Sequence, residues 1–459
     1  MKSVLGLSIA LCLSTSLRWT ALSYTFVLQS KRSRSSGTVL NEKESDNEGD
    51  AAALAPPLRL YNAMERGVGP FLENPSKGDH GKYGLGTICM YTCGPTLYDS
   101  AHVGNFRAFL TYDLIKRVMR EVYKKEVVHV CNLTDVDDKI IKKCRDLGVE
   151  GREITEKYEK VFYRDLRQLN CVMADHYPKA TSHIPEVVDM IKSLEKNGLA
   201  YRDQDGWWFD TSKDQKYGGV LVEKDDDSGS ENENPDGQEQ QTAQRVRGGN
   251  SKDFALWKFP KPSVDVPSLT YDTSIGAGRP GWHIECSAIS KSYFGDAIDL
   301  HMGGVDLKFP HHENEIAQSE GAWEGGGEGM VGDRKGRRWC GCWVHNGFVD
   351  MKGVKMSKSL GNQLILQAAC PSTLSKRAFR YMVVSSHYRS SLAYTDEALQ
   401  ASMKAVRRLD RVRKDVRDYV SCYDEYVEGK GVGDPSRGAS LSSADSPLVK
   451  TCLEEAEKF

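Results

Sequence analysis

Residues 87–132 have the sequence TICMYTCGPTLYDSAHVGNFRAFLTYDLIKRVMREVYKKEVVHVCN, in which two apolar runs flank a longer amphipathic segment. The first run is rich in β-branched and aromatic residues and ends at Gly94 and Pro95, as a strand does where it enters a turn. Apolar residues including Phe106 and Leu110 then recur at helical spacing, and VVHVC follows as a second buried strand. A strand, a helix and a strand in this order predict a βαβ unit, and therefore a parallel, Rossmann-like sheet.

Changes in composition mark the other parts of the chain. Mixed α and β patterns begin at about Leu58. Residues 223–253 are of low complexity and cannot bury apolar area, which predicts a disordered surface insertion. From about Ser375 the apolar spacing is helical. The sequence thus predicts an α/β protein with a Rossmann-like parallel-sheet domain, an inserted subdomain and a C-terminal α-helical region.

The overall charge and the cysteine content narrow the class of protein. The 459 residues include 62 Lys and Arg and 64 Asp and Glu, a formal net charge of −2. This balance excludes a polycation, so any surface for nucleic acid has to be local. The 12 cysteines are scattered through a long chain, which favours a reducing compartment with thiols or metal ligands over a secreted disulfide framework.

Residues 1–57 differ from the rest and are predicted to be a targeting leader followed by a disordered linker. The apolar run at 4–13 is too short to cross a bilayer as a helix and fits the core of a signal peptide. Residues 16–39 are rich in Ser and Arg and contain no acidic residue, as in organellar transit peptides. Together these parts predict import into a plastid or a mitochondrion; the alternative is a disordered tail on a cytoplasmic protein. No other segment is long and apolar enough for a membrane helix, so no membrane contact is expected of the mature protein.

Two short motifs indicate phosphate binding. HVGN, at residues 102–105, lies at the predicted helix start, where free N–H groups and the positive end of the helix dipole suit a phosphate. KMSKS, at residues 355–359, offers two lysines that can hold a polyphosphate as point charges. Each motif alone is more often structural or solvated. Together and in this order they resemble the paired signatures of class I aminoacyl-tRNA synthetases.

Four further side chains are of the kinds that zinc prefers, namely Cys93, Cys286, His311 and Glu315. His311 and Glu315 are four residues apart and would share one face of a helix. Two thiolates, an imidazole and a carboxylate make a suitable tetrahedral shell for Zn²⁺. Spacing alone leaves open the alternative that the cysteines are small buried apolar residues and that the H-x-x-x-E pattern is incidental.

The longer motifs together resemble the cysteinyl-tRNA synthetases. In chain order they are YTCGPT with HVGN, NLTDVDDKI, GRPGWHIECSA, FPHHENEIAQS, KMSKSLGN and SSHYRSSLAYTDE. The resemblance implies a catalytic domain at 58–370 with a connective insertion at about 140–265. It also implies a helical bundle region with an incomplete anticodon-binding part at 371–459. Because only about 100 residues follow KMSKS, anticodon recognition is in doubt, and the chain is either a genuine short form or incomplete.

The resemblance also implies roles for individual residues. One Zn²⁺ ion per chain would be held by Cys93, Cys286, His311 and Glu315. ATP binding and catalysis would fall to His102, Gly104, Asn105, Gly304, Asp306, Lys355 and Lys358. Asn105 replaces the second His of the better-known HIGH motif, which the family tolerates. The amino-acid pocket would include Thr134 and Trp282, and for Trp282 core packing is the alternative.

Other histidines and cysteines have less specific interpretations. His283 and His312 lie beside predicted zinc ligands in the sequence and are either second-layer partners or structural residues. Cys340 and Cys342 form a close pair, for which ordinary thiols are favoured over a second metal or a redox role.

The activity that the resemblance implies is cysteine–tRNA ligation. L-Cysteine and ATP would form cysteinyl-adenylate and pyrophosphate, and the cysteinyl group would then pass to tRNA(Cys) for translation. Zn²⁺ prefers a thiolate to a hydroxyl, so binding of the substrate sulfur would select cysteine over serine. A pocket that relied on shape would separate such similar substrates only ~10–200-fold. The expected partners are tRNA(Cys), L-cysteine, ATP and Mg²⁺, and the expected state is a monomer.

Two other functions share parts of this pattern. An ATP-dependent ligase that joins cysteine to an amino sugar would have the same zinc and ATP motifs. A non-catalytic paralogue that binds only RNA or zinc is the alternative from another class, and the retention of His102, Lys355 and Lys358 argues against it. Cysteine-dependent exchange of ATP with pyrophosphate distinguishes the enzyme from the paralogue.

Overall fold

A computed structural model of the chain describes residues 56–71, 83, 86–222, 252–323, 338–351, 354–356 and 363–427. The predicted leader up to residue 55, the low-complexity segment at 223–251 and Lys358 lie outside the described residues. For Lys355 only the backbone is described.

By their internal contacts, residues 1–400 and 401–459 form two compact units. The first unit contains the sheets and the candidate site. The second contains most of the last described helix, α12 (Asp396–Val427). The domain limits given above from the sequence stay a prediction. No described helix is long and apolar enough to cross a membrane.

The centre of the first unit is a four-stranded parallel sheet with the strand order β10-β9-β3-β4. Its strands are β3 (Ile88–Thr92), β4 (Val127–Cys131), β9 (Ile298–Gly304) and β10 (Cys340–Asn346). All five residues of β3 are buried, as expected of a parallel strand that is covered on both faces. The prediction of a Rossmann-like parallel sheet is therefore confirmed.

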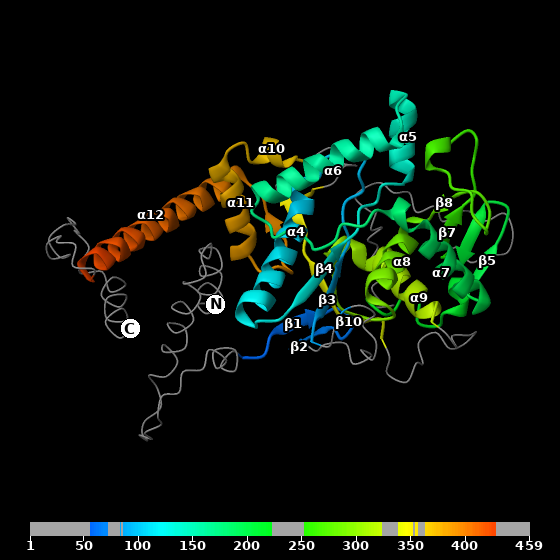
Figure 1. The fold of residues 1–459 in the computed structure, drawn as a ribbon, viewed down its shortest axis with the longest axis horizontal. Helices are drawn as coiled ribbons and strands as arrows, with labels where there is room; N and C mark the ends of the chain where they lie inside the picture. The colour runs from blue at the N-terminus through cyan, green and yellow to red at the C-terminus, as the bar shows by residue number, and fades with distance from the viewer. Residues whose placement is uncertain are drawn as a thin grey trace, which may run out of the picture. The chain divides into compact units, whose positions relative to one another are not determined.

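Helix α4 (Val103–Arg117) connects β3 to β4 and is extended by a π-helical turn (Val118–Val122). The basic residues Lys116 and Arg117 in its last turn complement the negative end of the helix dipole. Two other helices, α6 (Gly151–Gln168) and α11 (Thr373–Ser385), lie close to α4 (Figure 1). The βαβ unit predicted from residues 87–132 is present.

The sheet has a point at which its strand order reverses. The connection from β3 leads to β4 on one side, whereas β9 pairs with the other side of β3. In open parallel sheets, ligands bind in the crevice beyond the carboxyl ends of the strands at such a point. Residues from Cys93 onward follow β3 there, and Gly304 ends β9.

A second, antiparallel sheet takes three of its four strands from the predicted insertion at about 140–265, and its fourth strand follows that range. Its strands, in spatial order, are β5 (Ala200–Arg202), β6 (Gly206–Phe209), β7 (Phe254–Lys258) and β8 (Arg279–Pro280). It packs with three helices, α7 (Ile184–Lys196), α8 (Trp282–Phe294) and α9 (Glu313–Gly321) (Figure 1).

The remaining described elements are short, apart from α5. They are β1 (Arg59–Asn62), β2 (Gly67–Pro70), α5 (Asp138–Leu147), β11 (Val349–Met351), β12 (Val354–Lys355), α10 (Leu366–Ala369) and β13 (Leu392–Ala393), with 3₁₀ turns between some of the elements.

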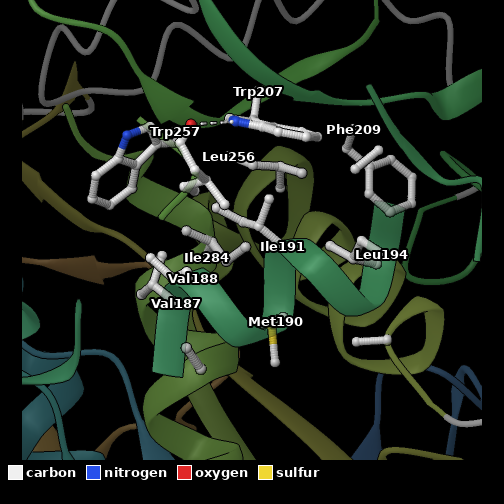
Figure 2. Close-up of a cluster of buried hydrophobic side chains, with 14 of the residues drawn as sticks. Val187, Val188, Met190, Ile191, Leu194, Trp207, Phe209, Leu256, Trp257 and Ile284 are labelled. Atoms are coloured by element: carbon white, nitrogen blue, oxygen red, sulfur yellow. Dashed lines mark hydrogen bonds between the residues drawn. The ribbon is translucent and has the colours of Figure 1, made fainter. Parts of the chain in front are cut away.

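The core beneath the second sheet also fixes the helices that carry the candidate site. Helix α7 turns Val187, Ile191 and Leu194 toward Trp207 and Trp257 of the sheet (Figure 2). These apolar residues recur every three or four positions, so they form a single stripe on the helix. Residues of α8 and α9 belong to the same cluster. A substitution that weakens the packing of this core is therefore expected to displace α8 and α9, which carry residues of the candidate site.

We expect Ile191→Ala to destabilise the chain by about 3 kcal/mol, because it empties a fully buried position in this cluster. The urea midpoint, followed by tryptophan fluorescence, should fall. Lys192→Ala, at an exposed position of the same helix, is the control and should change the stability by less than about 0.5 kcal/mol. Equal midpoints for the two variants would contradict the prediction.

Candidate active site

A pocket opens at the carboxyl ends of β3 and β9, where the strand order reverses. Its wall includes Cys93, His102, Gly104, Asn105, Thr134, Trp282, Cys286, Gly304, Asp306 and His311. Of the other residues predicted for the site, Glu315 is fully buried, and the side chains of Lys355 and Lys358 lie outside the described residues. Met356, the neighbour of Lys355, lines the pocket. Residues from five separate motifs thus meet in one place.

Three elements bring the four predicted zinc ligands together. Cys93 directly follows β3, and Cys286 lies in the second turn of α8. His311 lies in the kinked turn Lys308–His312 that leads into α9, and Glu315 lies in the first turn of α9. Because α8 and α9 pack against each other and against the common core, these side chains face one another.

The ligand atoms of the four residues lie close together. Cys93 Sγ is 3.9 Å from Cys286 Sγ, 3.5 Å from His311 Nε2 and 3.6 Å from Glu315 Oε1. His311 Nε2 lies 3.6 Å from Cys286 Sγ and 3.0 Å from Glu315 Oε1. A tetrahedral Zn²⁺ ion with ordinary bond lengths places its ligand atoms roughly 3.3 to 3.8 Å apart. The types of donor fit Zn²⁺, and three of the five separations fall in this range, with the two sulfur atoms at 3.9 Å and the His311–Glu315 pair at 3.0 Å just outside it.

The same residues carry strongly shifted pKa values. Burial opposes ionisation, yet hydrogen bonding from Cys93 and the charge of His311 lower the pKa of Cys286 to about 6. Burial and the nearby Cys286 raise the pKa of Cys93 well above its ordinary value. Against the effect of burial, Glu315 and Cys286 raise the pKa of His311 to about 10. A bound metal ion needs both thiolates and a neutral imidazole, so its binding displaces protons from Cys93 and His311.

Further histidines form a second layer around the ligands. His301 Nε2 lies 2.8 Å from Glu315 Oε2, and His283 Nδ1 lies 2.9 Å from His311 Nδ1. His312 Nε2 lies 3.5 Å from Cys93 Sγ. Such partners orient the ligands of a metal site. Against the effect of burial, His301 and His311 lower the pKa of Glu315 to about 2.

The second layer also offers an alternative set of ligand atoms. Cys93, His301, His312 and Glu315 have donor atoms as close together as the predicted set does. Thiolates are preferred ligands of the borderline-soft Zn²⁺ ion, which favours the set with two cysteines, the one containing Cys286.

The opposite wall of the pocket is the N-terminus of α4. Asn105 Oδ1 accepts a hydrogen bond of 3.1 Å from the backbone N–H of His102, and the His102 side chain caps the backbone of Asn105 in return. This reciprocal capping fixes both side chains at the start of the helix. Gly104 between them leaves room for the His102 ring, since a Cβ at this position would lie 2.7 Å from His102 Cε1. The wall presents a helix dipole and a histidine, both suited to a phosphate.

Between these walls lie the residues predicted for the amino-acid pocket. Thr134 donates a hydrogen bond of 3.0 Å to Glu285 Oε2, and both residues are buried. Trp282 is half-buried and stacks on His311, with the ring centroids 4.2 Å apart. Its position in the pocket wall differs from that of the tryptophans in the core described above. Asp306 follows the end of β9 on the same wall.

Three polar residues of this region had no signal in the sequence. His301 and His345 are single histidines within mostly apolar strands, and neither has a partner at a recognisable spacing. Their contacts come from the sheet: β9 and β10 are parallel neighbours, and His345 Nε2 lies 2.8 Å from His312 Nδ1. Glu285 is adjacent to Cys286 in the sequence. Its carboxylate is buried beside the pocket, which becomes apparent only from the position of α8 in the structure.

Cys340 and Cys342 are buried in β10, and the Cys340 thiol donates to the backbone carbonyl of Cys342 at 3.2 Å. Neither belongs to a cluster of possible metal ligands in the part of the chain that is described.

Comparisons with known proteins show what the chain is similar to. The family model "tRNA synthetases class I (C) catalytic domain" matches residues 82–404. The chain is 40% identical over 346 residues to a cysteine--tRNA ligase of Pyrococcus furiosus, covering 75% of this chain and 65% of that protein. It is 38% identical over 367 residues to a cysteine--tRNA ligase of Thermococcus onnurineus, covering 78% and 68%. A solved structure of Mycobacterium tuberculosis methionyl-tRNA synthetase in complex with methionyl-adenylate aligns with a TM-score of 0.47 and 16% identity, over 69% of this chain and 68% of that one.

The chain spans about two thirds of the length of the curated relatives that it matches. The matched region of 82–404 contains every described residue of the candidate site. The chain belongs to the family of class I (C) tRNA synthetase catalytic domains, and these curated relatives at about 40% identity are cysteine--tRNA ligases.

Proposed function

We propose that the chain is a cysteine–tRNA ligase, which activates L-cysteine with ATP and transfers it to tRNA(Cys). The observation that carries the proposal is a single pocket with the Cys93, Cys286, His311 and Glu315 cluster at one wall and the N-terminus of α4 at the other. One wall suits a thiol and the other suits a phosphate. These are the distinctive groups of the two substrates in the first step.

Cys93, Cys286, His311 and Glu315 would hold one Zn²⁺ ion. When bound, this ion supplies a preference for a thiolate over a hydroxyl, and thus for cysteine over serine. Trp282 and Thr134 lie beside the cluster and would orient the amino acid, so that its carboxylate points toward the α4 wall.

In the activation step the cysteine carboxylate attacks the α-phosphorus of ATP and pyrophosphate leaves. His102 and the α4 N-terminus would stabilise the charge that develops on the phosphoryl oxygens. Lys355, Lys358 and Mg²⁺ would neutralise the pyrophosphate. Asp306 would accept hydrogen bonds from the ribose hydroxyls. Positioning and electrostatics suffice, because no covalent intermediate with the enzyme is needed.

In the second step the activated cysteine passes to the tRNA. A hydroxyl of the terminal ribose of tRNA(Cys) would attack the carbonyl carbon of cysteinyl-adenylate, forming the cysteinyl ester and releasing AMP. Exposed Arg407, Arg408 and Arg411 of α12 are suited to contact RNA phosphates.

We further propose that the protein is a monomer and that residues 1–57 direct its import into a plastid or mitochondrion. A fluorescent fusion carrying these residues tests the import.

The test of the proposal uses the full chain with ATP, Mg²⁺, zinc and either cysteine or serine. We expect exchange of pyrophosphate into ATP with cysteine and at least about 1,000-fold less with serine, beyond the ~10–200-fold that a pocket relying on shape achieves. We also expect charging of transcribed tRNA(Cys). Exchange without charging would favour another acceptor, such as an amino sugar. Folded, zinc-loaded protein with neither activity would refute the proposal.

A further inference from the structure

Arg107 is a buried cation of α4 that the proposed mechanism does not use. It lies two residues beyond Asn105 and is 1% exposed. Among the described residues, its guanidinium donates to four backbone carbonyls: those of Phe348 and Ser390, that of Tyr388 at 3.2 Å and that of His387 at 3.5 Å. No carboxylate of the described residues is hydrogen-bonded to this guanidinium, although the charge of Asp350 in the neighbouring segment favours its protonated form. A buried charge without a directly bonded counter-charge is an expensive way to join two segments. The role of the Arg107 guanidinium is therefore better explained by the positions in which it holds the two segments than by a contribution to the free energy of folding.

Three of these carbonyls belong to the 387–390 loop, which follows α11 and contains the HYRS part of a motif with no assigned role. The loop is bound to the chain segment at 347–350. Gly347 N–H donates to Tyr388 O at 2.9 Å, and Leu392 N–H donates to Phe348 O at 2.9 Å. The two backbones are so close that a Cβ on Gly347 would lie 2.6 Å from Arg389 O. Arg107 therefore holds both segments at once.

The 347–350 segment leads directly to the lysine motif. Gly347, Phe348 and Val349 line the pocket. β11 then pairs with β12 in antiparallel register, with Asp350 opposite Lys355. Met356 N–H donates to Val349 O at 3.1 Å, which closes the hairpin at the pocket wall. The hydrogen bond from the Arg107 guanidinium to the Phe348 carbonyl thus determines the position of this hairpin relative to α4.

The 387–390 loop is also anchored on its other side. The backbone N–H of Tyr61 in β1 donates to the Tyr388 hydroxyl at 3.3 Å. The Arg389 guanidinium lies over the Tyr61 ring, 3.3 Å from its centroid. Since β1 is in contact with β10 of the central sheet, the loop is a fixed support for the hairpin.

We propose that Arg107 is a positioning residue for adenylate formation, which holds the described part of the β11–β12 hairpin, with Met356 at the pocket wall, in a fixed position relative to the α4 N-terminus. The proposal rests on the proposed function, because it concerns the activation step. The planar guanidinium reaches several carbonyls at once, whereas the ammonium of a lysine is a single point charge on a flexible stem. A lysine at this position would keep the charge and lose the fixed geometry.

The test compares Arg107→Lys with Arg380→Lys. Arg380 joins α11 to the far end of α4 and is paired with a carboxylate, because its guanidinium lies 2.5 Å from Asp113 Oδ2. We expect Arg107→Lys to lower kcat for pyrophosphate exchange about 10- to 100-fold per titrated active site, since small misplacements have effects of this size. Zinc content and the KM for cysteine should stay within twofold of the unsubstituted chain. Arg380→Lys should leave all of these parameters within about threefold.

Three outcomes would overturn the proposal: an unchanged kcat in Arg107→Lys, an equal fall in Arg380→Lys, or a joint loss of zinc, cysteine binding and kcat. If Arg107→Lys does not fold, Gly347→Ala replaces it, because its methyl group separates the same backbones without removing a charge. An unchanged kcat in that variant also refutes the proposal. Absence of exchange in the unsubstituted chain refutes the proposed function instead, so the two failures are distinguishable.

Discussion

Replacing Cys286 by serine is expected to remove the zinc ion and to lower cysteine-dependent pyrophosphate exchange by at least about 100-fold. Loss of an outer partner of a metal ligand already costs ~10–100-fold, and Cys286 contributes a donor atom itself. A serine hydroxyl is a poor ligand because it is protonated at neutral pH, whereas the surroundings of Cys286 lower its thiol pKa to about 6. The change in volume is small, so the fold should persist.

The measurements are zinc content after gel filtration and exchange per mole of folded chain. Cys340→Ser is the matched control, because that thiol is equally buried and donates only to the Cys342 carbonyl at 3.2 Å. It should keep its zinc and its activity. Full zinc content in Cys286→Ser would show that the ion is held elsewhere, for instance by the set that includes His301 and His312. Cys286 would then not be the ligand that determines affinity.

The sequence was informative where a local pattern reports on its own surroundings. The βαβ unit followed from apolar spacing, because strands and helices differ in the period at which they bury side chains. The prediction that HVGN starts a helix also agrees with the structure. The candidate ligands depended on a resemblance, since spacing alone did not separate a zinc site from buried thiols. The structure brings their donor atoms together, which spacing could not establish.

The rest of the site depends on contacts between distant segments. His301 reaches Glu315 only because the turn after β9 brings α9 back beside that strand, and His345 of β10 reaches His312 only because β10 lies beside β9. Arg107 looks like one more residue of an amphipathic helix. Its role becomes visible only when the 387–390 loop, about 280 residues later in the chain, is found around its guanidinium. No pattern within a window of sequence contains such information.

Replacing Gly104 by alanine is expected to lower kcat for pyrophosphate exchange about 100-fold while the fold and the zinc content stay unchanged. A Cβ at this position would lie 2.7 Å from His102 Cε1 and 2.8 Å from His102 Nδ1. Both atoms belong to the end of a side chain, so the ring moves aside at little cost in stability. Alanine also favours the helix over glycine by ~1 kcal/mol, which offsets that cost. The substitution therefore changes the position of His102 rather than the fold.

The expected fall in kcat follows from the position of the His102 ring in the pocket. Its ring caps α4 and lines the pocket, where charge develops on the phosphoryl oxygens in the transition state. Removing one such stabilising donor from an active site lowers kcat ~10²–10³-fold. Gly69→Ala is the matched control, because a Cβ there has no atom within 4 Å. A kcat in Gly104→Ala equal to that of the control would mean that His102 does not act on the phosphate. The α4 N-terminus would then do so through its backbone N–H groups alone.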